Sequence, residues 1–260
     1  MNNTYEKWLE VIREDGSLLE YIPKKHMTYR LCLEAVKQYG MAIKFVPEKC
    51  KFNELCNIAV ERNGIALQYV PEEYRTYKLC LLAVQNTGKA LKYVPEKFKT
   101  CEICNTAIET YDFALEFIPD MYKTYSLCRR IIKQNGLCLK FIPPRHRTYE
   151  LCIEAVKQNG TAIKYVLDRY KTYELCLEAV KQNGLVLHHV PLKHRSYELS
   201  LKAAKQNRYI IPYISDKYKT DEFYKELLKS NNIDNDQFKL KWIFDKMISN
   251  NKKYLQASGY

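Results

Sequence analysis

Hydrophobic and polar residues alternate along the chain with a helical period. In residues 28–51, the apolar positions Leu31, Cys32, Ala35 and Val36 are spaced as one face of a helix requires. They predict a helix over about residues 29–39. A second apolar run predicts a shorter helix over about residues 41–46, which Pro47 ends because proline cannot continue a helix. The stretch therefore predicts a helical hairpin.

The same pattern returns every 24 residues in one register. Threonine recurs at Thr4, Thr28, Thr76, Thr100, Thr124, Thr148, Thr172 and Thr220, with Phe52 and Ser196 in the two gaps. Glycine recurs at Gly16, Gly40, Gly64, Gly88, Gly136, Gly160 and Gly184, with Asp112 interrupting the series. Proline recurs at Pro23, Pro47, Pro71, Pro95, Pro119, Pro143 and Pro191, with Leu167 in one place. Three columns held in phase define a repeat.

The columns also predict how each helix begins and ends. Threonine is a favoured N-cap, so a helix is expected to start just after Thr28 and its equivalents. In several repeats a glutamate follows two residues later, which suits the positive end of a helix dipole. Asn-Gly at the other end predicts a left-handed cap, with glycine supplying the positive φ.

One such hairpin cannot bury its apolar face alone, but stacked copies can. The sequence therefore predicts an all-α fold, an α-solenoid of ten 24-residue helix-turn-helix repeats with terminal caps, forming one unit over residues 1–249. The repeats are 4–27, 28–51, 52–75, 76–99, 100–123, 124–147, 148–171, 172–195, 196–219 and 220–233, followed by a capping helix at 234–249 and a flexible tail at 250–260. An aromatic column is expected to fill the space between repeats, with the tyrosine hydroxyls reaching the solvent edge: Tyr21, Phe45, Tyr69, Tyr93, Phe117, Phe141, Tyr165 and Tyr213.

The string A-V-K-Q-N-G-x-A-I-K-Y-V at residues 155–166, which returns with variations at 35–46, resembles a short repeat family of unknown function. That family is abundant in giant DNA viruses of amoebae, and related repeats occur in bacteria that live inside amoebae. The resemblance covers residues 4 to about 230. It implies a helical repeat protein without known catalysis, and it assigns no functional residues.

The composition fits a globular protein: 260 residues, 47% hydrophobic and 28% charged. No apolar run reaches the roughly 18 residues that a membrane span needs, and the N-terminus lacks a signal peptide. Without a secretory signal, the ten cysteines are expected to be reduced thiols in the cytoplasm, or in the host cytoplasm for a viral protein.

Cysteine and histidine are the first candidates for chemistry. Seven cysteines share one column on the apolar face, where the thiol acts as a small hydrophobic group: Cys32, Cys56, Cys80, Cys104, Cys128, Cys152 and Cys176. Cys101 and Cys104 form an isolated C-x-x-C that lacks a second pair of ligands. His188, His189 and His194 are another conceivable metal set, but adjacent histidines point apart on a helix. We expect no metal and no cofactor.

Phosphate-binding loops and hydrolase signatures are missing, and the glycines recur at helix ends instead. We therefore expect no enzymatic activity and no small-molecule substrate.

Charge gives the one functional lead, because the net charge is +12. One column, which we call the basic ladder, is cationic in nearly every repeat: Lys51, Arg75, Lys99, Lys123, Arg147, Lys171, Arg195 and Lys219. Its members could pair with the glutamate three residues later, as in Lys51/Glu54, or face phosphates or an acidic protein as a ligand-facing stripe.

Two functions are compatible with these features. The first is a non-enzymatic scaffold that mediates protein–protein interaction or self-association, since solenoids present long surfaces. The alternative is sequence-independent nucleic-acid binding through the basic C-terminal half, which would weaken steeply with salt.

Overall fold

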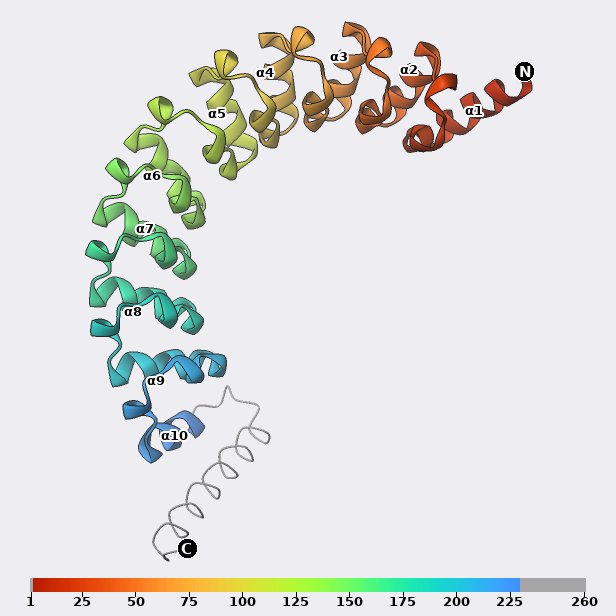
Figure 1. Cartoon of the computed structure of the whole chain (residues 1–260). Helices are drawn as coiled ribbons and strands as arrows, with labels where there is room; N and C mark the ends of the chain where they lie inside the picture. The colour runs from red at the N-terminus through yellow and green to blue at the C-terminus, as the bar shows by residue number, and fades with distance from the viewer. Residues whose placement is uncertain (1, 230–260) are drawn as a thin grey trace, which may run out of the picture. The chain divides into compact units, whose positions relative to one another are not determined.

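The computed structural model describes residues 2–229, and within this range the chain is helical with no strand (Figure 1). Its α-helices are α1 (Asn2–Glu14), α2 (Tyr29–Gln38), α3 (Asn53–Arg62), α4 (Tyr77–Asn86), α5 (Cys101–Thr110), α6 (Tyr125–Gln134), α7 (Tyr149–Gln158), α8 (Tyr173–Gln182), α9 (Tyr197–Gln206) and α10 (Asp221–Leu228). Since α2 to α10 each begin at the same point of the 24-residue register, the predicted all-α solenoid of helical repeats is confirmed.

The second helix of each hairpin is a six-residue 3₁₀ helix, and a three-residue 3₁₀ turn follows it. The six-residue helices are η1 (Gly16–Tyr21), η3 (Gly40–Phe45), η5 (Gly64–Tyr69), η7 (Gly88–Tyr93), η9 (Asp112–Phe117), η11 (Gly136–Phe141), η13 (Gly160–Tyr165), η15 (Gly184–His189) and η17 (Arg208–Tyr213). The short turns are η2 (Lys24–His26), η4 (Glu48–Cys50), η6 (Glu72–Tyr74), η8 (Glu96–Phe98), η10 (Asp120–Tyr122), η12 (Pro144–His146), η14 (Asp168–Tyr170), η16 (Leu192–His194) and η18 (Asp216–Tyr218). Short pieces of this length suit 3₁₀ hydrogen bonding.

The predicted N-caps are confirmed at Thr28 and at most of its equivalents, but not at Thr4, because α1 already begins at Asn2. Thr28 has extended backbone angles, and its Oγ1 accepts a 3.3 Å hydrogen bond from the N–H of Leu31. Ser196 caps α9 in the same way, whereas Phe52 before α3 makes no side-chain cap. The column is threonine or serine because the hydroxyl satisfies an N–H that the helix leaves unpaired.

The predicted left-handed glycine cap is wrong. None of the seven glycines of the column has a φ in the left-handed region, and Asn159, which precedes Gly160, is extended. A Cβ at Gly160 would lie 2.7 Å from the carbonyl oxygen of Ala179 in the next repeat. Glycine is required because the backbone of one repeat lies against the backbone of the next.

Small aliphatic side chains, not the aromatic column, fill the space between repeats. Leu31, Cys32, Ala35 and Val36 of α2 are fully buried, as are Ala42 and Ile43 of η3. By contrast, Tyr21 is 78% exposed and Tyr213 is 62% exposed, and Phe45 and Tyr93 are half-buried. The interpretation of this column as a filler is therefore wrong.

A glutamine amide joins one repeat to the next. Gln182 Oε1 accepts a 2.7 Å hydrogen bond from the N–H of Gly160, and its Nε2 donates to the carbonyls of Val156 (2.9 Å) and Lys157 (2.7 Å). These carbonyls lie in the last turn of α7, where helical partners are missing. The side-chain amide of Gln182 thus satisfies backbone groups at the end of α7 and at the start of η13 in the preceding repeat.

The described chain forms two compact units. Unit 1 comprises residues 2–134 and 141–146, and unit 2 comprises 135–140 and 147–229. Neighbouring α-helices contact each other within each unit, for example α3 with α4 and α8 with α9. The prediction of one solenoid over residues 1–249 stays a prediction. The predicted capping helix at 234–249 and tail at 250–260 lie outside the described residues, as does the end of the tenth repeat.

The N-terminal helix differs from the rest on its outer side. Lys7 and Val11 occupy positions that later repeats bury as leucine and alanine, yet Lys7 is exposed and Val11 is 44% exposed. This is the pattern expected of a terminal cap. Between residues 2 and 229 no helix is long and apolar enough to cross a membrane.

Candidate functional site

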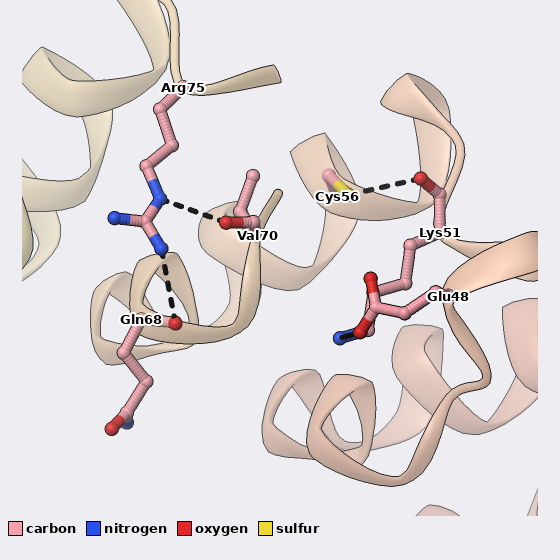
Figure 2. Close-up of polar contacts among 6 residues, drawn as sticks. All are labelled: Glu48, Lys51, Cys56, Gln68, Val70 and Arg75. Atoms are coloured by element: carbon pink, nitrogen blue, oxygen red, sulfur yellow. Dashed lines mark hydrogen bonds and ion pairs between the residues drawn. The ribbon is translucent and has the colours of Figure 1, made fainter. Parts of the chain in front are cut away.

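The lysines of the basic ladder are largely buried. The side chains of Lys51, Lys99, Lys123 and Lys171 are between 7% and 11% exposed, and each reaches a carboxylate three residues earlier. Lys51 Nζ lies 2.7 Å from Glu48 Oε1 (Figure 2). Lys219 pairs with Asp216 at 2.9 Å. The predicted pairing with the following glutamate is wrong, because the 3₁₀ turn brings the preceding carboxylate beside the lysine.

The arginines of the ladder hydrogen-bond to backbone instead. Arg75 donates from Nε to the carbonyl of Val70 at 2.8 Å and from Nη2 to that of Gln68 at 3.2 Å (Figure 2). Arg195 donates to Val190 and His188 in the same way. Burial lowers the pKa of Arg195 from its usual value. The guanidinium groups thus satisfy carbonyls at the end of each six-residue 3₁₀ helix.

The basic ladder therefore has partners within the protein: the lysines pair within a repeat, and two of the arginines, Arg75 and Arg147, also reach the next repeat. Arg147 follows the same pattern, with hydrogen bonds to the carbonyls of Tyr165 and Lys140. A ligand-facing role for the ladder stays a prediction, and buried side chains with internal partners do not favour it.

The cysteine column is also internal. Burial raises the pKa of Cys32 to about 12 and that of Cys56 to about 11. Cys56 Sγ lies 3.9 Å from the carbonyl oxygen of Lys51 (Figure 2). A thiol with such a pKa carries almost no thiolate at neutral pH, so it is a poor nucleophile and ligand. In the C-x-x-C pair, Cys101 is exposed but Cys104 is buried, with its pKa raised to about 11.

Four of the histidines lie beside other aromatic rings in tilted pairs: His26, His146, His188 and His189. The centroids of His188 and His189 are 3.9 Å apart, so the expectation that these adjacent histidines point apart is wrong. The rings of His26 and Trp8 have centroids 4.9 Å apart. Burial lowers the pKa of His189, and the nearby charges of His188, Lys171 and Lys164 add to the effect. Among residues 2–229, no group of three or more histidine, cysteine, aspartate or glutamate side chains could hold a metal ion.

One helix departs from the repeat pattern with charged residues. The α6 helix lines a shallow hollow with Tyr125, Ser126, Arg129, Arg130 and Lys133. Arg129 and Arg130 stand where most repeats have leucine and glutamate. The hollow adds cations to the surface of unit 1, but no other repeat has an arginine pair at the positions of Arg129 and Arg130.

The surface that does recur lies on the six-residue 3₁₀ helices. We call it the ring column: Tyr21, Phe45, Tyr69, Tyr93 and Phe117 in unit 1, and Tyr165, His189 and Tyr213 in unit 2. These side chains are half-buried or exposed. Lys44 Nζ lies 4.3 Å from the ring centroid of Phe45, and Lys164 Nζ lies 4.8 Å from that of Tyr165. Sequence reasoning expected only the tyrosine hydroxyls of this column at the solvent edge and not an exposed surface of rings, although tyrosine preceded by lysine was a signal of exposure.

The sequence model of a family described as a domain of unknown function (DUF4116) matches the chain six times, at residues 5–51, 29–75, 53–99, 76–123, 125–171 and 172–219. Each match spans two consecutive repeats. Neither a curated protein nor a solved structure matches the chain.

Proposed function

The chain belongs to this family of domains of unknown function (DUF4116), and we propose that it is a non-enzymatic repeat scaffold that mediates protein–protein interaction or self-association. One observation supports this most. The groups capable of chemistry, the cysteine column and the basic ladder, are buried or have partners within the protein, whereas the ring column reaches the surface in register as half-buried or exposed side chains. Such a surface is suited to binding.

In unit 1 the ring column has the composition of a protein interface. Half-buried Phe45 lies on η3, which also carries half-buried Met41, and half-buried Tyr93 lies on η7. Charges of both signs flank them, with Lys44 before one ring and Glu116 before another. Aromatic residues and methionine are enriched at interfaces. Packed helices lie roughly 8–10 Å apart, about three residues of extended chain, so one ring per repeat suits an extended partner segment.

The N-terminal cap restricts the mode of self-association. Lys7 and Val11 replace the leucine and alanine that other repeats bury against a neighbour. A second copy stacked end-on at α1 would bury the ammonium group of Lys7 without a partner, which is costly. We therefore propose side-by-side association along the ring column of unit 1.

We further propose the cytoplasm as the location, or the host cytoplasm for a viral member of the family. Ten cysteines without disulfide partners fit a reducing compartment.

The test measures association and partner capture together. Sedimentation velocity of the full chain over a range of concentrations reports self-association, and proximity labelling in cells reports bound proteins. We expect Phe45→Ser with Tyr93→Ser to abolish whichever association the wild type shows. The matched control is Met121→Ser, which removes an exposed hydrophobic side chain (76%) outside the column. Equal loss in the control, or full binding by the ring variant, would overturn the proposal.

A further inference from the structure

The ring column of unit 2 has a different chemistry, and we propose that this face binds single-stranded nucleic acid by base stacking, without sequence preference. The inference goes beyond the protein scaffold, because it concerns another surface and another class of partner.

Rings on this face lie close together and continue from one repeat to the next. His188 and His189 end η15 with centroids 3.9 Å apart, and His188 is 6.2 Å from Tyr213 on η17 of the following repeat. Tyr209, also on η17, is 69% exposed and Tyr213 is 62% exposed. His188, His189 and Tyr213 thus form a group of neighbouring rings that spans two repeats, and Tyr165 ends η13 at the equivalent position of the repeat before them.

Cations accompany these rings. Lys164 Nζ lies 4.8 Å from the ring centroid of Tyr165, and Arg208 Cζ lies 5.6 Å from that of Tyr209. Lys164 is also close enough to His189 to lower the pKa of that imidazole. Cations beside exposed aromatic faces are the arrangement that binds the phosphates and bases of a single strand.

Carboxylates are missing from the same helices. The sequences of η13, η15 and η17 contain no aspartate or glutamate. In unit 1, by contrast, Glu20 and Glu116 occupy the register position that Lys164 and His188 hold in unit 2. The face of unit 2 is therefore complementary to a polyanion, whereas that of unit 1 carries charges of both signs.

The rings distinguish a single strand from other polyanions. In a duplex the bases stack on each other and their faces are not available to protein rings. An acidic peptide could neutralise the cations, but it has no planar faces to stack. Base–aromatic stacking is tolerant of sequence because every base has a π-face.

The experiment is a fluorescence-anisotropy titration of the full chain with labelled oligo(dT) and oligo(U) 20-mers, a duplex of the same length, and a poly-glutamate peptide. We expect the single strands to bind at least tenfold more tightly than the duplex or the peptide. Tyr209→Leu with Tyr213→Leu should weaken single-strand binding by on the order of tenfold or more. Lys164→Gln with Arg208→Gln should lower the slope of log affinity against log salt by about 1.4.

The matched control is Tyr21→Leu, which changes an exposed ring at the equivalent position of unit 1. All variants keep residues 230–260, and thermal melts establish that each is folded. Equal affinity for duplex, an unchanged affinity of the tyrosine variant, preferred binding of poly-glutamate, or no binding at 50 mM salt would each overturn the inference. None of these variants changes Phe45 or Tyr93, so the result of the nucleic-acid test is independent of the test of the proposed protein scaffold.

Discussion

Between residues 2 and 229, neighbouring repeats are connected by two kinds of joint. Seven joints pair a glycine at the start of a 3₁₀ helix with an alanine in the next α-helix: Gly16–Ala35, Gly40–Ala59, Gly64–Ala83, Gly88–Ala107, Gly136–Ala155, Gly160–Ala179 and Gly184–Ala203. Two joints lose both residues together, because Asp112 and Ile131 replace one pair and Arg208 and Leu227 replace another.

This difference shows that the packing between two repeats depends on the glycine and the alanine together, and not on glycine alone. Where glycine is present it is buried against the alanine carbonyl, whereas Asp112 is only half-buried. The 24-residue register nevertheless continues through Thr124 after the first exceptional joint. Repeat length and joint packing are therefore separate properties, and the ring column keeps its register where the joint changes.

The largest expected effect comes from filling a glycine joint. Gly160→Val should lower the free energy of unfolding by about 3 kcal/mol, because the new side chain must displace the Ala179 carbonyl. Urea denaturation followed by circular dichroism measures it, and hydrogen exchange shows whether the loss is local, as expected of a repeat array. Asp112→Val is the control and should change stability by less than about 1 kcal/mol. Similar losses at both sites would remove the distinction between the joints.

A double-mutant cycle tests the pairing directly. Gly160→Asp and Ala179→Ile should each cost about 2 kcal/mol, because both sites are fully packed. The double variant copies the Asp112/Ile131 joint, so its cost should be at least about 1 kcal/mol smaller than the sum of the two single costs. Strict additivity would mean that the paired replacements in the sequence are unrelated.

Much of the fold was predictable because its determinants are local. The threonine caps and the apolar face of each α-helix follow from residues within one repeat. The role of glycine was not predictable from the sequence, because a left-handed cap and a close backbone approach both require a residue without Cβ. Only the position of Ala179 in the next repeat decides between them.

The candidate site was harder to predict for a similar reason. Lys51 has a glutamate three residues away on either side, Glu48 and Glu54, and the sequence does not say which one lies near its ammonium group. The 3₁₀ turn selects Glu48, and Glu54 accepts a hydrogen bond from Tyr29 of the preceding repeat. Ring exposure depends in the same way on neighbouring repeats, which a column of aromatic residues does not reveal.

A smaller effect is expected from the glutamine of the joint. Gln182→Ala removes one acceptor and two donated hydrogen bonds between repeats and should cost about 1 kcal/mol, since water replaces part of the loss. Gln38→Ala is the matched control, because Gln38 donates one hydrogen bond, to the carbonyl of Glu14. The same denaturation experiment should rank Gln182→Ala between the glycine variants and the control. A larger loss of stability in Gln38→Ala would mean that the hydrogen bonds of Gln182 are not what stabilises the contact between the two repeats.

The smallest effect is expected within a repeat, at the basic ladder. The Lys123 ammonium donates to Asp120 and lowers the pKa of that carboxyl. A lowered pKa means that the pair stabilises the fold above pH of about 4 and that this contribution is lost as pH falls through the folded pKa. Because Asp120 is exposed, Lys123→Met should change stability by less than about 1 kcal/mol at pH 7.

The same variant should raise the pKa of Asp120 toward its ordinary value, which a carboxyl NMR titration measures. Between about pH 4 and pH 2 the wild type should lose slightly more stability than the variant, since only the wild type has the pair to lose. A loss near 3 kcal/mol at pH 7 would instead make a contact within one repeat as strong as the Gly160 joint. The stability of the array would then come from single repeats, and the contrast between its joints would have little consequence.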